Sequence, residues 1–320
     1  MKKTISVAMA TYNGGKYLRE QLNSIYNQDL NPDEVVVSDD GSIDDTIAIL
    51  EEYHQKKGLV YSVNTGKHGV NNNFFRAISL CSKDVIAICD QDDIWLPNKL
   101  SISYKKLLEI DNGKPACVSS LCNHIDRNGN IISSLDDEAD TSGCAATLLT
   151  YGKGQNRSQG CSLMFNRALA DVVLDKINKY PEIMSIMFYD GFIAFTAAVI
   201  GVKFNIGRRL MLYRHHDANV LAFEGQKVPS LLSRIRKNDY FMFIPQSRIQ
   251  KIPKLLEWFS EKEMKSDAFI LCRKLSDISS SPHFWGLLKI LTINELSIHR
   301  KAKILLGTLV MDAIKIVVGK

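Results

Sequence analysis

The 320-residue sequence lacks three features that define familiar protein classes. It has no run of about 20 uninterrupted apolar residues, so no transmembrane helix is expected. Its seven cysteines are odd in number and show no Cys-x-x-Cys spacing, which argues against a disulfide framework or a zinc site and favours a reducing cytoplasm. No Gly-x-Gly-x-x-Gly segment is present, so a dinucleotide-binding oxidoreductase is not expected.

Charge is unevenly distributed along the chain. The net charge is +5, but residues 221–320 carry 17 Lys/Arg against 9 Asp/Glu, whereas residues 1–220 have a net charge of −3. A basic region can attract an anionic membrane, nucleic acid or an acidic substrate, and it can equally be the solvated face of ordinary helices.

The first third of the chain alternates short runs rich in Val and Ile with segments whose apolar residues have helical spacing. The predicted strands are Ile5–Ala10, Glu34–Ser38, Leu59–Val63 and Val85–Cys89. Helical spacing is found over Tyr17–Ile25 and Ile47–Tyr53. This alternation predicts an α/β fold with a mostly parallel sheet flanked by helices.

The remainder is less regular. Further strands are predicted at Ala116–Leu121, Gln159–Phe165 and Gly201–Ile206, a helix at 191–200, and a mobile loop over a site at 136–154. From about Pro229, apolar residues sit among many Lys and Arg, so we divide the chain into residues 1–225 and a helical, basic region 226–320. Its amphipathic end, 302–318, either packs on the domain or lies on a membrane surface.

Polar residues follow three of the four predicted strands. These are Thr11-Tyr12-Asn13-Gly14, Asp39-Asp40-Gly41-Ser42 and Asp90-Gln91-Asp92-Asp93. In open α/β sheets ligands bind at the carboxyl ends of the strands, so the three segments predict one site. Asp, Asn and Ser also cap helices, and Ser42 can cap a helix that starts near Ile43.

The run Asp90–Asp93 holds three carboxylates within four residues. In a compact site such groups repel one another, so some must be protonated or a cation must bind. Apolar residues flank the run on both sides, which argues against a loose acidic tail. Oxygen ligands suit Mg²⁺ or Mn²⁺, which typically also bind substrate phosphates. The alternative is an acidic surface turn without a ligand.

In this order and at these distances, the three segments resemble the inverting glycosyltransferase family 2, which has the GT-A fold. Cys89–Trp95, together with Asn64-Thr65-Gly66, Gly69-Val70 and Asn73-Phe74, is similar to the rhamnosyltransferase-like branch of that family. The resemblance covers roughly residues 4–220. It implies a GT-A glycosyltransferase domain over residues 1–225, with residues 226–320 as a helical extension.

The resemblance implies a role for each matching residue. Nucleotide-sugar contacts are implied for Thr11, Tyr12, Asn13, Asp39, Asp40, Asn73, Asp90, Gln91, Asp93 and Arg214. Within this set Asp40 would contact the base, whose imide N–H a carboxylate can read, and Arg214 would pair with phosphate. Asp92 would be the main metal ligand. His216 matches the His of a Tyr-Arg-x-His segment and would be a second ligand, unless it is structural.

The resemblance places the catalytic base at an acidic residue that starts a helix after the acceptor loop. Asp190 fits that position, although it can equally be the N-cap of the helix. Gly191 stands where this branch often has Trp. Near the acceptor, Cys161 is expected to be a small packing residue rather than a nucleophile.

The function implied is metal-dependent, inverting sugar transfer in cell-surface polysaccharide synthesis, with L-rhamnose from dTDP-rhamnose as the expected sugar. The expected cofactor is Mn²⁺ or Mg²⁺, and the expected acceptor is a lipid-linked saccharide; no nucleic acid is expected. A UDP-sugar donor, or a non-catalytic carbohydrate- or membrane-binding module, are the alternatives. A cytoplasmic location is expected, with the C-terminal region serving peripheral contact with the inner membrane face or homo-oligomerisation.

Overall fold

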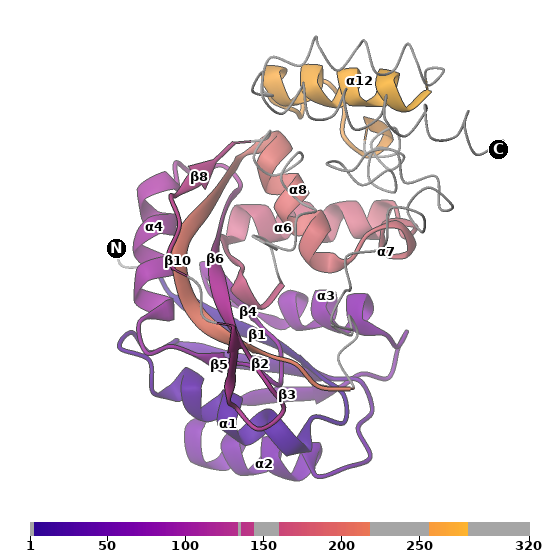
Figure 1. Cartoon of the computed structure of the whole chain (residues 1–320). Helices are drawn as coiled ribbons and strands as arrows, with labels where there is room; N and C mark the ends of the chain where they lie inside the picture. The colour runs from indigo at the N-terminus through magenta and orange to yellow at the C-terminus, as the bar shows by residue number, and fades with distance from the viewer. Residues whose placement is uncertain (1–2, 134–135, 144–159, 218–255, 281–320) are drawn as a thin grey trace, which may run out of the picture. The chain divides into compact units, whose positions relative to one another are not determined.

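The computed structural model describes residues 3–133, 136–143, 160–217 and 256–280 (Figure 1). The chain divides into two compact units, Met1–Gly143 with Arg157–Ala222, and Cys144–Asn156 with Phe223–Lys320. In the second unit the one complete described element is helix α12, Ser266–Ser280, which buries Ala268, Leu271 and Cys272. The division of the chain into a domain at residues 1–225 and a helical, basic region at residues 226–320 stays a prediction.

The first unit is built on one mixed sheet whose longest ladders are parallel. Its strand order is β3-β2-β1-β4-β9-β6-β10-β5, with β7 paired to β6 and β8 to β10. The strands are β1 Ile5–Thr11, β2 Glu34–Asp39, β3 Val60–Val63, β4 Val85–Cys89, β5 Ile94–Trp95, β6 Ala116–Ile125, β7 Ile131–Ser133, β8 Thr141–Ser142, β9 Met164–Asn166 and β10 Val202–Arg214. Strands β3, β2, β1 and β4 run parallel, as do β6 and β10.

Helices cover both faces of this sheet (Figure 1). They are α1 Gly15–Tyr26, α2 Thr46–Lys57, α3 Val70–Leu80, α4 Lys99–Ile110, α6 Arg167–Lys179, α7 Ile183–Ile186 and α8 Tyr189–Ile200, with a 3₁₀ turn, η1, at Gly160–Ser162. The apolar sides of α1, α2 and α4 share one core with alternate residues of β1, β2 and β4. Helices α3, α6 and α8 lie on the opposite face. The expected α/β sheet flanked by helices is therefore confirmed.

The register of the parallel strands brings their polar ends together. Thr11, the last residue of β1, pairs with Asp39, the last residue of β2. Met9 of β1 pairs with Cys89, so β4 ends beside them and the acidic run follows directly. The segments that follow β1, β2 and β4 consequently share one edge of the sheet, as the sequence predicts.

Two sequence predictions need correction. The predicted strand Gln159–Phe165 is in its described part the 3₁₀ turn η1 followed by β9, because Cys161 to Phe165 are buried by packing against β4 and β6 rather than by strand pairing alone. Ser42 does not cap a helix near Ile43, since α2 begins at Thr46 with Asp45 as its N-cap. Of the predicted loop 136–154 the structure describes residues 136–143, which include β8. The predicted amphipathic segment 302–318 lies outside the described residues.

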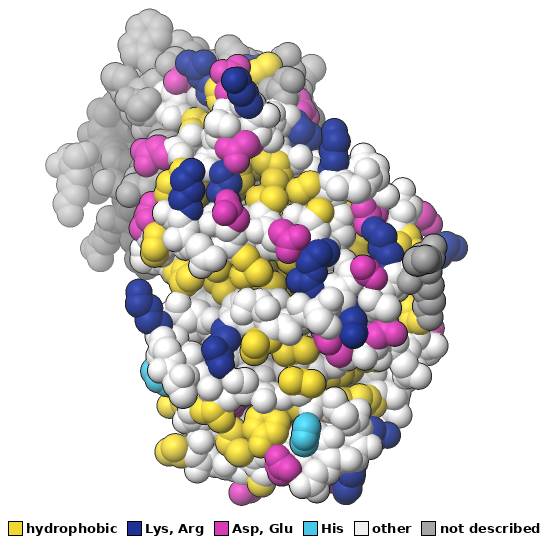
Figure 2. Space-filling view, turned by 180° about the vertical axis from the view of Figure 1, so that it is seen from behind, with side chains coloured by type: hydrophobic (Ala, Val, Ile, Leu, Met, Phe, Trp, Pro, Cys, Tyr) yellow, Lys and Arg dark blue, Asp and Glu magenta, His cyan; other side chains and the backbone are white. Residues whose placement is uncertain are grey.

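The surface gives no sign of a single dominant charge on the face shown in Figure 2, where described Lys and Arg side chains alternate with Asp and Glu. A block of one sign, of the kind that binds nucleic acid, is missing from the described residues of this face. Within those same ranges, no helix has the length and apolar character needed to cross a membrane.

Candidate active site

The acidic run Asp90–Asp93 connects β4 to β5 and is partly exposed up to Asp92 and buried at Asp93. Asp90 is partly exposed, the Asp92 side chain is 16% exposed, and Asp93 is fully buried. Asp93 Oδ1 accepts a hydrogen bond from the Arg214 N–H at 3.0 Å. The run is therefore anchored in the fold at its last residue, Asp93.

Crowding of these carboxylates perturbs their proton affinities. Burial, together with the nearby charges of Asp92 and Asp190, raises the pKa of Asp90 to about 7. Burial, and then the charges of Asp92 and Asp90, raise the pKa of Asp93 well above its usual range. A bound cation would reverse the sign of the local field and favour the ionised carboxylates.

Cys161 of η1 also faces the acidic run. One ligand atom each from Asp90, Asp93 and Cys161 lie within 4.8 Å of one another. Burial raises the pKa of the Cys161 thiol well above its usual range, and the charges of Asp93 and Asp90 add to this effect. The thiol is thereby kept protonated, which fits the expectation that Cys161 is not a nucleophile.

The end of β10 holds the acidic run from the other side. The guanidinium of Arg214 donates from Nε to the Asp92 main-chain oxygen at 2.8 Å. His216 Nε2 lies 2.8 Å from Asp92 Oδ2. The structure therefore brings the two predicted metal ligands into direct contact, although 124 residues separate them in the sequence.

Arg214 itself is almost completely enclosed. Its side chain is 2% exposed, pairs with Glu20 at 2.5 Å and lies over the ring of Tyr17. Tyr17 also packs against the His216 ring, with 4.9 Å between ring centroids. The phosphate contact of Arg214 stays a prediction.

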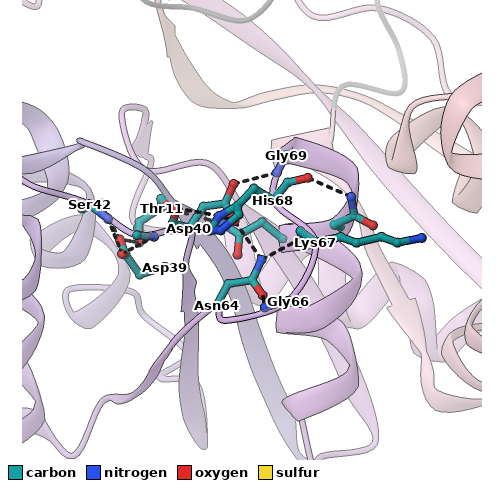
Figure 3. Close-up of polar contacts among 12 residues, drawn as sticks. Thr11, Asp39, Asp40, Ser42, Asn64, Gly66, Lys67, His68 and Gly69 are labelled. Carbon is teal, nitrogen blue, oxygen red and sulfur yellow. Dashed lines mark hydrogen bonds and ion pairs between the residues drawn. The ribbon is translucent and has the colours of Figure 1, made fainter.

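Asp39 organises the loop that follows β2 (Figure 3). Its buried carboxylate accepts from the N–H groups of Gly41 and Ser42 and from the hydroxyls of Ser42 and Thr11. All four distances lie between 2.6 and 3.0 Å. Four donors match the acceptor capacity of a carboxylate, so Asp39 acts here through the loop that it holds.

Asp40 joins this loop to the segment after β3 (Figure 3). Its Oδ1 accepts from Asn64 Nδ2 at 2.8 Å and lies 3.0 Å from His68 Nδ1, while Oδ2 accepts from the Gly69 N–H at 2.7 Å. Sequence reasoning missed Asn64 and His68 as partners of Asp40. The one available signal was the position of Asn64-Thr65-Gly66 directly after a strand.

Tyr12 and Gln91 form a reciprocal pair that links the ends of β1 and β4. The Tyr12 N–H donates to Gln91 Oε1 at 2.9 Å, and Gln91 Nε2 donates to the Tyr12 oxygen at 3.1 Å. Asn13 has a left-handed backbone, with φ of 47°, and its side-chain oxygen accepts from the Ile43 N–H. The Tyr12 side chain is left 56% exposed, which suits a residue that contacts a ligand.

Asn73 and Asn71 project from α3 with different roles. Asn73 is 3% exposed and donates to the main-chain oxygen of Thr11 at 3.1 Å. Asn71 Nδ2 donates to the oxygens of Met184 and Met187, and its Oδ1 accepts from the Tyr189 N–H. Asn73 therefore supports the end of β1, and Asn71 fixes the start of α8.

Asp190 lies in the first turn of α8. The alternative that it caps this helix is wrong, because α8 begins at Tyr189 and its N-cap is Phe188. The preceding Tyr189 is buried, stacks on Phe74 with 3.8 Å between ring centroids, and directs its hydroxyl to Asp90 Oδ1 at 3.4 Å. Tyr189, the residue before Asp190, is held in place by its stacking on Phe74 and its hydrogen bond to Asn71. The charge of Asp190 acts on Asp90.

Comparison with known proteins relates the chain to glycosyltransferases. The sequence matches the family described as Glycosyl transferase family 2 over residues 6–172. The dTDP-rhamnosyl transferase RfbG of Shigella flexneri is 30% identical over 219 residues, 66% of this chain and 72% of that protein. An uncharacterized glycosyltransferase of Nostoc sp. is 29% identical over 228 residues, 67% of this chain and 66% of its own length.

Other similarities are partial or concern the fold alone. Chondroitin synthase of Escherichia coli is 32% identical over 133 residues, which are 41% of this chain and 19% of that protein. The crystal structure of S. aureus TarS 1-349 in complex with UDP-GlcNAc superposes with a TM-score of 0.53 at 15% identity, covering 97% of this chain and 90% of that one. The expected GT-A type of α/β fold is thereby confirmed.

Proposed function

The chain belongs to glycosyltransferase family 2, and from this premise we propose that it transfers L-rhamnose from dTDP-rhamnose to a saccharide hydroxyl with inversion at the anomeric carbon. The observation that carries the proposal is that the charges of Asp92 and Asp190 both act on Asp90 and help to raise its pKa. Such a carboxylate group suits a reaction that needs both a cation and a proton acceptor.

Asp92 and His216 are proposed to hold a divalent cation, Mn²⁺ or Mg²⁺. Adjacent ligand atoms of an octahedral ion with bonds of 2.0–2.1 Å are about 3 Å apart. The separation of 2.8 Å between Asp92 Oδ2 and His216 Nε2 fits that spacing. The ion would supply charge neutralisation for the donor's diphosphate as the leaving group develops.

Asp190 is proposed to accept the proton of the acceptor hydroxyl as the oxygen attacks the anomeric carbon. A general base must be held rigidly, and Asp190 follows Tyr189, whose main chain is bonded to Asn71 and whose ring is stacked on Phe74. One displacement inverts the configuration, so the enzyme needs no covalent intermediate.

The donor's base is proposed to lie beside Asp40 and Tyr12. Asp40 Oδ2 has one donor in the described ranges, so its remaining lone pair can accept an imide N–H. Uracil and thymine share that group, so Asp40 does not distinguish dTDP- from UDP-sugars. The similarity to a protein named dTDP-rhamnosyl transferase favours the former.

The acceptor is proposed to be a lipid-linked saccharide at the inner face of the cell membrane. The basic excess of residues 221–320, 17 Lys/Arg against 9 Asp/Glu, supports an electrostatic contact with anionic lipid. Binding of the full chain to vesicles with and without anionic lipid, measured at two salt concentrations, tests this contact.

A donor screen scored by released nucleotide tests the proposed activity. The full chain should release dTDP from dTDP-rhamnose with Mn²⁺ and an acceptor present, and chelation should abolish the release. Calorimetry with each donor, with and without Mn²⁺, separates an enzyme from a carbohydrate-binding module. Donor binding that ignores both the metal and Asp92→Ala would contradict the proposal.

A further inference from the structure

Arg214, the last residue of β10, forms an ion pair with Glu20 of helix α1. The Arg214 side chain is only 2% exposed, whereas the Glu20 side chain is 53% exposed, and Arg214 Nη2 lies 2.5 Å from Glu20 Oε2. A guanidinium removed from water is strongly unfavourable unless charged or polar acceptors surround it. Glu20 therefore provides a buried cation with a carboxylate that itself remains in contact with solvent.

The position of Glu20 within α1 predicts an ordinary solvated side chain. Lys16 stands four residues earlier, one turn away on the same side of the helix, and is the local partner that such spacing favours. In the structure the Lys16 ammonium instead lies 4.9 Å from the ring centroid of Tyr17. Glu20 reaches Arg214, which is 194 residues further along the chain. The contact therefore results from tertiary packing and not from helical spacing.

Tyr17 supports the same end of β10. Because Tyr17 and Glu20 are three positions apart in α1, their side chains are neighbours on the helix surface. The Tyr17 ring centroid lies 4.7 Å from the guanidinium carbon of Arg214, and the ring packs against His216 with 4.9 Å between centroids. One turn of α1 thus contacts both Arg214 and His216.

The guanidinium of Arg214 connects Glu20 to the acidic run. Its Nε donates to the main-chain oxygen of Asp92 at 2.8 Å, while the Arg214 main-chain N–H donates to Asp93 Oδ1 at 3.0 Å. A guanidinium is planar and rigid, so the nitrogen that meets Glu20 and the nitrogen that meets Asp92 move together. Loss of the contact with Glu20 would therefore displace the Asp92 main chain.

Such a displacement would reach the proposed cation ligands. His216 follows Arg214 by two residues, and its Nε2 lies 2.8 Å from Asp92 Oδ2. The separation of these two atoms depends on how the end of β10 lies against the acidic run, and Arg214 makes two hydrogen bonds between these segments. Glu20 is thus connected to both ligands through Arg214.

We propose that Glu20 is a positioning residue for the cation site: through the guanidinium of Arg214 it sets the position of Asp92 relative to His216. This inference rests on the proposed function for its link to the cation. The negative charge of Glu20 would by itself also favour a nearby cation, so charge and contact have to be separated. Glu20→Gln removes the charge, whereas Glu20→Asp keeps the charge and withdraws the carboxylate from Arg214.

The test titrates Mn²⁺ against donor turnover in the full chain. Glu20→Gln and Glu20→Asp should each raise the half-saturating Mn²⁺ concentration about tenfold, in the range found for residues that orient metal ligands, while kcat at saturating Mn²⁺ stays within about twofold. Glu52→Gln is the matched control, because it breaks another ion pair of α1, that of Arg19 with Glu52 at 2.7 Å, and should leave the Mn²⁺ requirement unchanged. An unchanged requirement in Glu20→Gln overturns the proposal, and so does a wild-type requirement in Glu20→Asp, which would show that charge alone acts.

A second set of measurements does not depend on catalysis. Bound Mn²⁺ should raise the melting temperature of the wild type without donor, and the rise should be smaller in both Glu20 variants. Metal-free melting temperatures of Glu20→Gln, Arg214→Met and the double variant form a cycle, with Arg214→Lys as the replacement if Arg214→Met does not fold. The double variant should lose less than the sum of the single variants, and additive losses would overturn the pairing. If the wild type shows neither a Mn²⁺-dependent melting temperature nor metal-dependent donor use, the proposed function fails, whereas the cycle still decides the contact between Glu20 and Arg214.

Discussion

The imidazole of His216 lies 2.8 Å from the carboxylate of Asp92, and this contact joins the end of β10 to the loop between β4 and β5. The ring is held from its other side by Tyr17 of α1. Three segments distant in the sequence thus meet around the contact between Asp92 and His216.

His216→Ala should therefore raise the half-saturating Mn²⁺ concentration. Removal of a ligand, or of a group that orients one, typically weakens metal binding by about 10–100-fold. Manganese titration of donor turnover measures the change, and His54→Ala, which alters a histidine of α2, is the matched control. Equal manganese requirements in the two variants would show that His216 is structural.

Asp190→Asn should abolish transfer while leaving donor binding nearly intact. Loss of a general base costs about 10²–10⁴-fold in rate, whereas an asparagine keeps the size and polarity of the side chain. The kcat for sugar transfer and the calorimetric dissociation constant of the donor are the two measurements. If the variant retains wild-type turnover, the base is another residue.

Asn71→Ala should destabilise the protein and weaken acceptor use. The change removes three hydrogen bonds that hold Met184, Met187 and Tyr189, each worth about 1 kcal/mol. Urea unfolding and the acceptor KM report the two effects. Asn72→Ala on the same helix removes a single bond to His68 and should change neither by a comparable amount.

Gly160→Ala should displace Tyr189 and reduce activity. A Cβ at this glycine would come within 1.8 Å of the Tyr189 hydroxyl, whose position is fixed by Phe74 and Asn71. Gly191→Ala is the control, because its added Cβ would meet only Met187 at 3.5 Å. Near-UV circular dichroism and turnover should change in Gly160→Ala alone.

The stability of the metal-free protein should fall as the pH rises toward 8. Burial and the charges of Asp92 and Asp190 raise the pKa of Asp90 from 3.8 to about 7. The folded state therefore holds this proton more tightly than the unfolded state. Its contribution to stability is complete below the unfolded pKa, near 3.8, and disappears as the pH rises through about 7.

Melting curves from pH 5 to pH 8 measure this loss, and Asp90→Asn should flatten the profile. Cation binding releases the same proton, so the manganese affinity of the wild type should rise across that interval. A profile that is identical in the wild type and in Asp90→Asn would rule out Asp90 as the titrating group.

The local sequence pattern was sufficient to predict where the strands end and in which order the polar segments follow them. Strands such as Val85–Cys89 are continuous apolar runs, and in a sheet of this type the residues after them must meet. The α/β fold could therefore be predicted from local pattern, whereas its GT-A type was implied by the resemblance of the three polar segments to a known family. The predicted strand Gln159–Phe165 is the exception. Its described residues are apolar because they are buried by tertiary packing, and the sequence alone cannot distinguish this cause from strand pairing.

The contacts that complete the site depend on long-range packing. Neither the bond between His68 and Asp40 nor that between His216 and Asp92 follows from spacing, since each joins loops from different strands. The burial of Lys99 is equally invisible in the sequence, where a lysine at the start of a helix predicts a solvated side chain. These features depend on how β5, β10 and η1 are arranged around the acidic run, which is visible only in the folded structure.

The most direct test of the account is release of dTDP from dTDP-rhamnose by the full chain with an acceptor, with Mn²⁺ and after chelation. Metal-dependent release that is lost in both Asp92→Ala and Asp190→Asn is the predicted result. Release that continues after chelation and in both variants would contradict the assignment of the cation to Asp92 and of the proton to Asp190.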